Sequence, residues 1–292
     1  MERLVPERTG TWTNAGKAVN EDLATVTENA AWVLDGATGV TDTNVTSADS
    51  DAKWYVERFD AYLRAHVWSA PSLHAVVREG IETVADEYEA IVGDRAIDDA
   101  ATPSAAIALV RWDDEMIETY VLADCTLLVR FAGGNVERIC DTRVTRFDEQ
   151  VEKEIEWLTT AGGLSVLEAQ AKVAPMLVEN RTKKNTDDGY WVLSMDPAAA
   201  PRGMETQYKR AELTSLSLFS DGFSALMDTY GAFRNWNDLE QYIEVEGVES
   251  LFGLLRDIER EDLTCERYSR IKPQDDATVA RIAFRFEEYN MT

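Results

Sequence analysis

Hydrophobic residues alternate with polar ones in some stretches of the chain and recur every three or four positions in others. Runs rich in β-branched and aromatic residues, set between Gly and Asn breaks, predict short strands at 9–16, 23–28 and 31–35. Large apolar residues then follow helical spacing at 52–68 and again at 72–92. The first third of the chain therefore predicts strands followed by a pair of helices.

The remaining two thirds continue this alternation of strand and helix patterns. Four strands are predicted in close succession and are interpreted as an antiparallel meander, at 104–112, 116–124, 126–134 and 135–140. A helical pattern then covers 146–180, and the polar connection 181–203 contains one short predicted strand at 190–194. Amphipathic helical patterns at 236–262 lead to a last strand after Asp276.

The composition is that of a folded protein with an unusually acidic surface. The chain has 292 residues, of which 45% are hydrophobic, so it can fill a substantial core. No repeat or linker divides it, and we expect one α+β domain over residues 1–292. The 54 acidic against 29 basic residues give a formal net charge of −25, which argues against binding to nucleic acid or to anionic membranes. A salt-rich cytoplasm and the binding of cations are two open explanations for this acidity.

Other side chains limit the chemistry that the protein can use. No apolar run approaches the roughly 20 residues that cross a bilayer, and the charged start lacks the apolar segment of a signal peptide, so we expect a cytoplasmic protein. Cys125, Cys140 and Cys265 form no CxxC pair, which argues against a disulfide framework or a structural zinc site. His66 and His74 lie in helical patterns away from the acidic motifs, which disfavours histidine-dependent hydrolase triads and histidine-bound zinc.

Carboxylates recur at strand boundaries in four segments, "NEDLATV", "WVLDGATG", "LFSDGFS" and "PQDDATV". Taken alone, Asp35 followed by Gly36 is also what an ordinary turn contains. If the four strand ends meet in space, their carboxylates form a cluster that consists of Glu21, Asp22, Asp35, Asp221 and Asp275. Each like-charged pair about 5 Å apart would cost roughly 3 kcal/mol at an effective dielectric of 20, and divalent cations would remove this repulsion. Oxygen ligands favour Mg²⁺ or Mn²⁺ over zinc or copper.

The order and surroundings of these motifs resemble those of the metal-dependent protein phosphatases, the type 2C serine/threonine phosphatases. That family carries an early "ED", then "DGxGG" after a strand, a central "GST" and "GDS", a late "SDG" and a final "DN" before a strand. The corresponding segments are "NED" (20–22), "DGATG" (35–39), "ATPSAA" (101–106), "LADCT" (122–126), "FSDG" (219–222) and "DDATV" (275–279). The resemblance covers nearly the whole chain. It implies two antiparallel sheets packed face to face, with helix pairs outside and a metal site at one end.

The resemblance also assigns roles to the clustered residues. It implies two Mn²⁺ or Mg²⁺ ions, with Asp35 bridging both. Asp221 and Asp275 would hold one ion, while Glu21 and the Gly36 carbonyl would orient the water shell of the other. Asp35 and Asp221 are therefore expected to be essential for catalysis.

Other matched positions depart from the family pattern or extend it. Asp22 is expected to support the ligands from behind. Asp124 matches a carboxylate that can hold a third metal ion with Asp221, although an ordinary turn between two strands is the alternative. Lys17 stands where the family has a phosphate-binding arginine, and its ammonium cannot grip two oxygens as a guanidinium does. Ala37 stands where some members carry a histidine that can protonate the leaving group.

The resemblance implies a phosphatase that removes phosphate from the serine or threonine of a phosphorylated protein, with water as the attacking group. Two alternatives stay open. One is a catalytically weak relative that binds a phosphoprotein or a regulatory partner, which the departures at Lys17, "LADCT" and "DGATG" favour. The other is a phosphatase for a small phosphorylated molecule. Nothing in the sequence indicates the oligomeric state.

Overall fold

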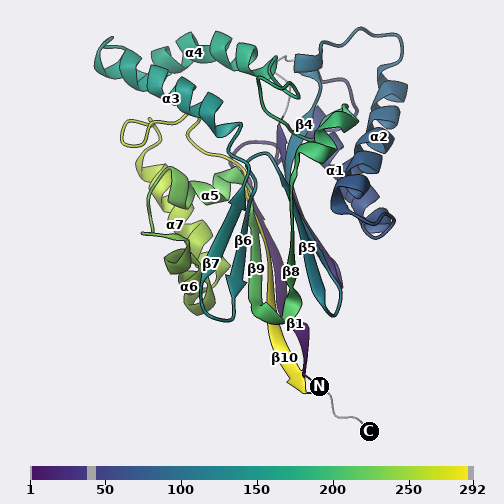
Figure 1. Cartoon of the computed structure of the whole chain (residues 1–292). Coiled ribbons are helices and arrows are strands. Elements are labelled where there is room, and N and C mark those ends of the chain that lie inside the picture. The colour runs from purple at the N-terminus through teal and green to yellow at the C-terminus, as the bar shows by residue number, and fades with distance from the viewer. Residues whose placement is uncertain (1, 38–43, 289–292) are drawn as a thin grey trace.

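The computed structural model describes residues 2–37 and 44–288, whose strands form two five-stranded antiparallel sheets (Figure 1). In spatial order, the first sheet contains β1 (Glu2–Asn14), β10 (Ala277–Glu288), β9 (Leu213–Phe219), β6 (Thr126–Phe131) and β7 (Val136–Cys140). The second contains β2 (Asp22–Val26), β3 (Ala30–Ala37), β4 (Ser104–Trp112), β5 (Met116–Leu122) and β8 (Met204–Lys209). The two sheets pack face to face, as the sequence predicted.

Helices cover both outer faces of this sandwich and one of its ends (Figure 1). The second sheet is covered by α1 (Asp51–His66) and α2 (Leu73–Val92). The first sheet is covered by α5 (Asp221–Asp228), α6 (Trp236–Glu246) and α7 (Val248–Glu261). The hairpin of α3 (Thr145–Thr160) and α4 (Val166–Arg181) lies over one end. The described residues also form three short 3₁₀ helices, η1 (Asp99–Ala101), η2 (Pro197–Arg202) and η3 (Arg210–Glu212). No helix in the described part of the chain is long and apolar enough to cross a membrane.

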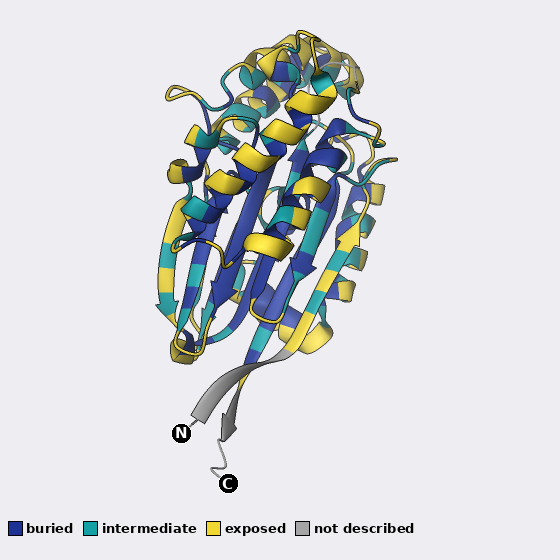
Figure 2. Ribbon diagram, turned by 90° about the vertical axis from the view of Figure 1, so that its right-hand side faces the viewer, coloured by how far each residue is buried: buried dark blue, intermediate teal, exposed yellow. Residues whose placement is uncertain are grey.

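The core has separate layers because successive residues of a strand point to opposite faces. On β3, Trp32 and Leu34 pack with the helices α1 and α2, whereas Ala31 and Val33 pack between the two sheets. Both sets are fully buried, which explains why this strand is an unbroken apolar run. Figure 2 shows the same organisation, with buried central strands and with exposed residues on the outer faces of the helices.

Two predicted details of the fold are wrong, and a third is refined. β5 and β6 belong to different sheets rather than to one meander, because the chain crosses over after β5 at Ala123, which has a φ of 64°. The segment 190–194 is not a strand and makes only isolated bridges, between Leu193 and Ala105 and between Tyr190 and Lys184. The helical pattern at 146–180 is two helices, which separate at Gly163 with a φ of 66°.

Candidate metal centre

The first sheet brings three of the predicted carboxylates to one edge. β9 ends at Phe219, which pairs with Val279 of β10 on one side and with Thr126 of β6 on the other. Because these strands are antiparallel, the chain that leaves β9 and the chains that enter β6 and β10 meet at the same end of the sheet. The three connections carry Asp221, Asp124 and Asp275.

The second sheet brings the remaining carboxylates to the same end of the sandwich. Asp22 of β2 lies directly opposite Asp35 of β3 in the antiparallel register. Next to this pair, the Gly36 amide donates to the Glu21 carbonyl at 3.2 Å. The two sheets are linked here because the Asp221 amide donates to Asp35 Oδ2 at 3.3 Å. β3 continues two residues past Asp35, so this carboxylate lies within the strand rather than just after its end.

Close backbone contacts at this end of the sandwich require glycine. A Cβ atom on Gly36 would lie 2.5 Å from the Glu21 carbonyl oxygen, and one on Gly222 would lie 2.0 Å from the Asp276 carbonyl oxygen. Both distances are far below van der Waals contact, so a side chain at either position would push the carboxylate-bearing segments apart. The glycines that follow Asp35 and Asp221 in the sequence motifs therefore serve a packing need.

Burial and the charges of their neighbours both disfavour the ionised form of the clustered carboxylates. Removal from water and the charges of Asp22, Asp221, Asp275 and Asp124 raise the pKa of Asp35 well above its usual value. Removal from water, followed by the charge of Asp221, raises the pKa of Asp22 to about 7 and that of Asp275 to about 6. The pKa of Asp124 is also raised well above normal, by removal from water and by Asp221. This arrangement favours the uptake of protons or cations.

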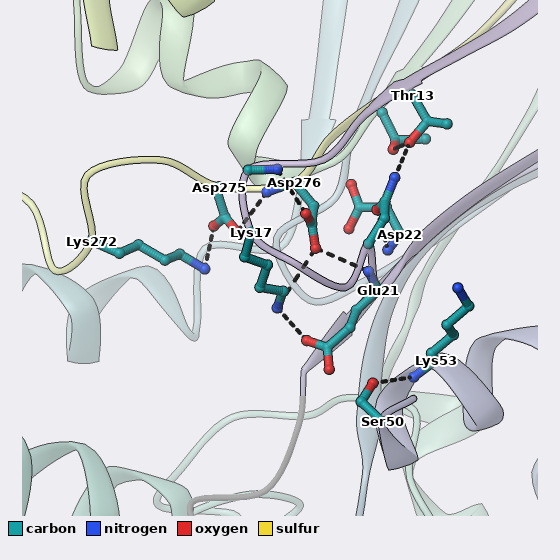
Figure 3. A network of polar contacts seen from close by, with 12 residues as sticks. Thr13, Lys17, Glu21, Asp22, Ser50, Lys53, Lys272, Asp275 and Asp276 are labelled. Carbon is teal, nitrogen blue, oxygen red and sulfur yellow. Dashed lines mark hydrogen bonds and ion pairs between the residues drawn. The ribbon is translucent and has the colours of Figure 1, made fainter. Parts of the chain in front are cut away.

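Two buried aspartates beside the cleft, Asp22 and Asp276, differ in how their oxygens are hydrogen-bonded. Asp22 is only 9% exposed, and its Oδ2 atom has no hydrogen-bond partner among the described residues. Asp276 is buried too, but both of its oxygens are used. They accept the Gly16 amide at 2.9 Å and the Glu21 amide at 2.9 Å, which fastens the β1–β2 connection to the start of β10 (Figure 3).

Two lysines extend into this acidic region. The Lys17 ammonium forms an ion pair with Glu21 and lies 3.6 Å from Asp276 Oδ2. Lys272 Nζ lies 2.5 Å from Asp275 Oδ2, and Figure 3 shows the two ion pairs on neighbouring segments. Burial alone would lower the pKa of Lys17, but its hydrogen bond to Glu21 and the charges of Glu21 and Asp276 raise it overall.

The cluster lines two neighbouring cavities of about 530 and 390 Å³. Five residues line both of them, and these are Asp124, Asp148, Asp221, Lys272 and Asp275. The smaller cavity is also lined by Lys17, Glu21, Asp35 and Gly36. The structure thus brings the predicted site residues together around one cleft, except Asp22, which lies in the protein behind it.

Comparison with known proteins identifies the family. The sequence matches the family described as Protein phosphatase 2C over residues 9–256. The chain belongs to the protein phosphatase 2C family. Comparison with curated protein sequences gives no match.

Solved structures with the same fold include bacterial members of this family. The serine/threonine phosphatase PstP of Mycobacterium tuberculosis is 14% identical, with a TM-score of 0.56 over 96% of this chain and 98% of that one. Stp1 of Staphylococcus aureus is 12% identical, with a TM-score of 0.55 over 96% and 97% of the two chains. The PstP catalytic domain in complex with two manganese ions is 14% identical, with a TM-score of 0.55 over 97% and 99%. These similarities show a shared fold.

The cleft of this phosphatase 2C protein does not present a preformed set of metal ligands among the described residues. Among the residues that the structure describes, no three His, Cys, Asp or Glu side chains converge closely enough to hold a metal ion. Glu21 and Asp275 face Lys17 and Lys272 instead. The individual metal-binding roles of the carboxylates therefore stay a prediction.

Three further residues of the cleft were not predicted. Asp148 of α3 lines both cavities, and removal from water together with the charge of Asp221 raises its pKa to about 7. Arg181 at the end of α4 donates to the Ala37 carbonyl at 2.7 Å and lines the smaller cavity. Lys272 is the third. Asp148 lies in a predicted helical pattern and Arg181 at the start of a predicted polar connection, both without any motif, so no sequence signal could have assigned them to the cleft.

Proposed function

We propose that the protein is a metal-dependent serine/threonine phosphoprotein phosphatase. The observation that carries this proposal is the convergence of Asp35, Asp221 and Asp275, from both sheets, on one cleft beside the unpartnered oxygen of Asp22. Membership of the phosphatase 2C family supports the same reaction. A phosphorylated protein is the proposed substrate.

The residues of the cleft suit hard divalent cations. The carboxylates of the cleft offer oxygen donors, and their pKa values, raised first by removal from water and then by one another's charges, favour the uptake of positive charge. Asp35 would be shared between two Mn²⁺ or Mg²⁺ ions, with Asp221 and Asp275 on one of them. Glu21 and the Gly36 carbonyl would serve the other ion. When bound, these ions supply Lewis-acid catalysis, which activates water and offsets charge on the phosphoryl group.

Three further residues of the chain extend this set. Asp124 and Asp221 both line the larger cavity and would hold a third ion there. Asp22 would act from behind, because its buried carboxylate adds negative charge next to Asp35 without reaching the cleft. Lys17 lines the smaller cavity and offers an ammonium for the phosphate of the substrate.

A catalytically weak phosphoprotein-binding relative is the second candidate function. It is favoured by Lys17 at the position of the family arginine and by the pairing of cleft carboxylates with lysines. Hydrolysis of p-nitrophenyl phosphate and of a phosphothreonine peptide, with Mn²⁺, Mg²⁺ or EDTA, separates the two. We expect turnover of both substrates that requires metal and disappears in EDTA. Tight binding of the phosphopeptide without turnover in excess metal would favour the second candidate, and equal turnover in EDTA would contradict a metal-dependent reaction.

We expect replacement of Lys17 by Ala to lower kcat/KM by about 10- to 100-fold, the equivalent of losing one hydrogen bond to a charged group. Lys17→Arg should lower KM, because a guanidinium can contact two phosphate oxygens at once. Mn²⁺ should still bind to both variants, which calorimetry can measure. Lys53→Ala is the matched control, since Lys53 also forms an i,i+4 ion pair, with Asp49 at 3.7 Å, but lines neither cavity. Wild-type kinetics in Lys17→Ala would place the phosphate contact elsewhere.

A further inference from the structure

Lys272 lies on the connection that leads into β10, three residues before Asp275. Its Nζ atom is 2.5 Å from Asp275 Oδ2, and Figure 3 shows the side chain extended along the loop toward that carboxylate. It lines both cavities of the cleft together with Asp221 and Asp275. None of the phosphatase motifs in the sequence includes this lysine.

The surroundings of the Lys272 ammonium are strongly negative. Asp275 Oδ2 lies 2.5 Å from it, Asp221 and Asp275 line both cavities beside it, and Asp35 lines the smaller one. A lysine ammonium carries its positive charge over the whole physiological pH range. The proposed function assigns these same three carboxylates to one metal ion, which shares Asp35 with the second ion.

The side chain of Lys272 is only partly buried. It is 53% exposed, whereas the side chain of Asp275 is 19% exposed. Rotation of the lysine into solvent would break its ion pair without opening any packed contact in the core. Asp275 would keep its place, because its Oδ1 atom accepts the Asp276 amide at 2.9 Å and its backbone carbonyl accepts from Arg256 at 2.8 Å.

We propose that Lys272 is a tethered counter-cation of the metal-free cleft, whose ammonium occupies the face of Asp275 that a metal ion needs and is displaced when the ion binds. The inference rests on the proposed function, since it assumes that Asp275 is a metal ligand. Lys272 then stabilises the metal-free protein by offsetting the repulsion among the carboxylates. It also weakens metal binding, because only the fraction of molecules with the lysine turned away is ready for the ion.

A contact between Lys272 and the phosphate of the substrate is the competing role. The geometry favours the counter-cation role, because the ammonium is paired directly with a carboxylate of the cluster, Asp275 Oδ2, at 2.5 Å. The two roles predict opposite results. Removing a counter-cation tightens metal binding, whereas removing a phosphate contact raises KM and leaves metal binding unchanged.

The test is calorimetric titration of Mn²⁺ into metal-stripped wild-type protein and into Lys272→Met, Lys272→Arg and Lys209→Met. Lys209 is the matched control, because it forms an i,i+3 ion pair with Glu212 at 3.9 Å and pairs with Met116 at the opposite end of the second sheet. We expect a dissociation constant about three- to tenfold smaller in Lys272→Met, the range for a partly exposed ion pair. Lys272→Arg and Lys209→Met should bind Mn²⁺ like the wild type. The stripped Lys272→Met protein should melt about 2 °C or more below the stripped wild type.

Each other outcome is decisive. Equal Mn²⁺ affinity in Lys272→Met and Lys209→Met would overturn the counter-cation role and leave the proposed phosphatase function standing. Unchanged affinity with a raised KM for p-nitrophenyl phosphate would make Lys272 a phosphate contact and likewise overturn the inference. Failure of the wild type itself to bind Mn²⁺ would overturn the proposed metal centre as well. If stripped Lys272→Met does not fold, Lys272→Gln gives the same comparison with a polar side chain.

Discussion

Replacement of Asp35 by Asn is expected to lower kcat by on the order of 10³-fold or more while the fold is kept. Asp35 is the carboxylate that the proposed centre shares between two cations, so the amide removes charge from both positions at once. The fold survives because the Asn side-chain oxygen can still accept the Asp221 amide, which Asp35 Oδ2 accepts at 3.3 Å. The measurements are kcat with p-nitrophenyl phosphate, Mn²⁺ affinity by calorimetry and the circular dichroism spectrum.

The control for this variant is Asp86→Asn, which makes the same chemical change at an exposed position of α2. It should keep wild-type turnover and alter the free energy of unfolding by no more than about 0.5 kcal/mol. The ordinary-turn interpretation of "DGATG" predicts that Asp35→Asn behaves in the same way. Normal turnover in a folded Asp35→Asn protein would therefore remove the central ligand of the proposed centre.

Much of the fold follows from local patterns along the chain. The apolar run at 31–35 predicts a buried strand, and in the structure β3 has helices on one face and the other sheet on the opposite face. The order of the acidic motifs predicts the family, and the family fixes how the strands pair. The carboxylates then come together because each lies within a few residues of a strand end on the same side of the sandwich.

The features of the fold and of the site that the sequence did not predict depend on interactions that local patterns do not encode. β8 was not predicted because it is a polar edge strand, "METQYK", with most of its residues exposed or half-buried. The crossover after β5 was missed because short, well-separated strands look alike whether they pair with their sequence neighbour or not. Lys272 stands three residues before Asp275, and sequence spacing alone does not show whether the loop turns its ammonium toward the carboxylates or into solvent.

The metal-free protein is expected to be most stable near pH 4 and to lose stability as the pH rises to 8. The pKa of Asp22 is raised to about 7 and that of Asp275 to about 6, both chiefly by removal from water. In the unfolded chain these groups titrate near 4, so between about pH 4 and pH 7 the folded state binds more protons than the unfolded state. The free energy of unfolding therefore decreases as the pH rises through this window. The expected loss is on the order of 3 kcal/mol, because the coupled groups share their protons.

Below pH 4 other groups reverse this dependence, so the free energy of unfolding decreases as the pH falls. Removal from water would raise the pKa of Asp262, but backbone amides and the Arg270 guanidinium lower it overall, so protonation of Asp262 costs stability in acid. The two opposing effects place the maximum where their windows meet, near pH 4.

Urea unfolding of metal-stripped protein from pH 4 to pH 8, with and without excess Mg²⁺, tests this dependence. Bound cations keep the carboxylates ionised, and their affinity rises as protons leave, so the metal-loaded protein should not lose stability between pH 5 and pH 8. Asp35→Asn should flatten the curve of the stripped protein, because it removes the titration of Asp35, whose pKa is raised well above its usual value by removal from water and by its acidic neighbours. A stripped wild-type protein whose stability increases steadily from pH 5 to pH 8 would mean that the cleft carboxylates are already ionised and compensated. In that case the lysines alone would balance the cluster, and relief of repulsion would no longer be a driving force for metal binding.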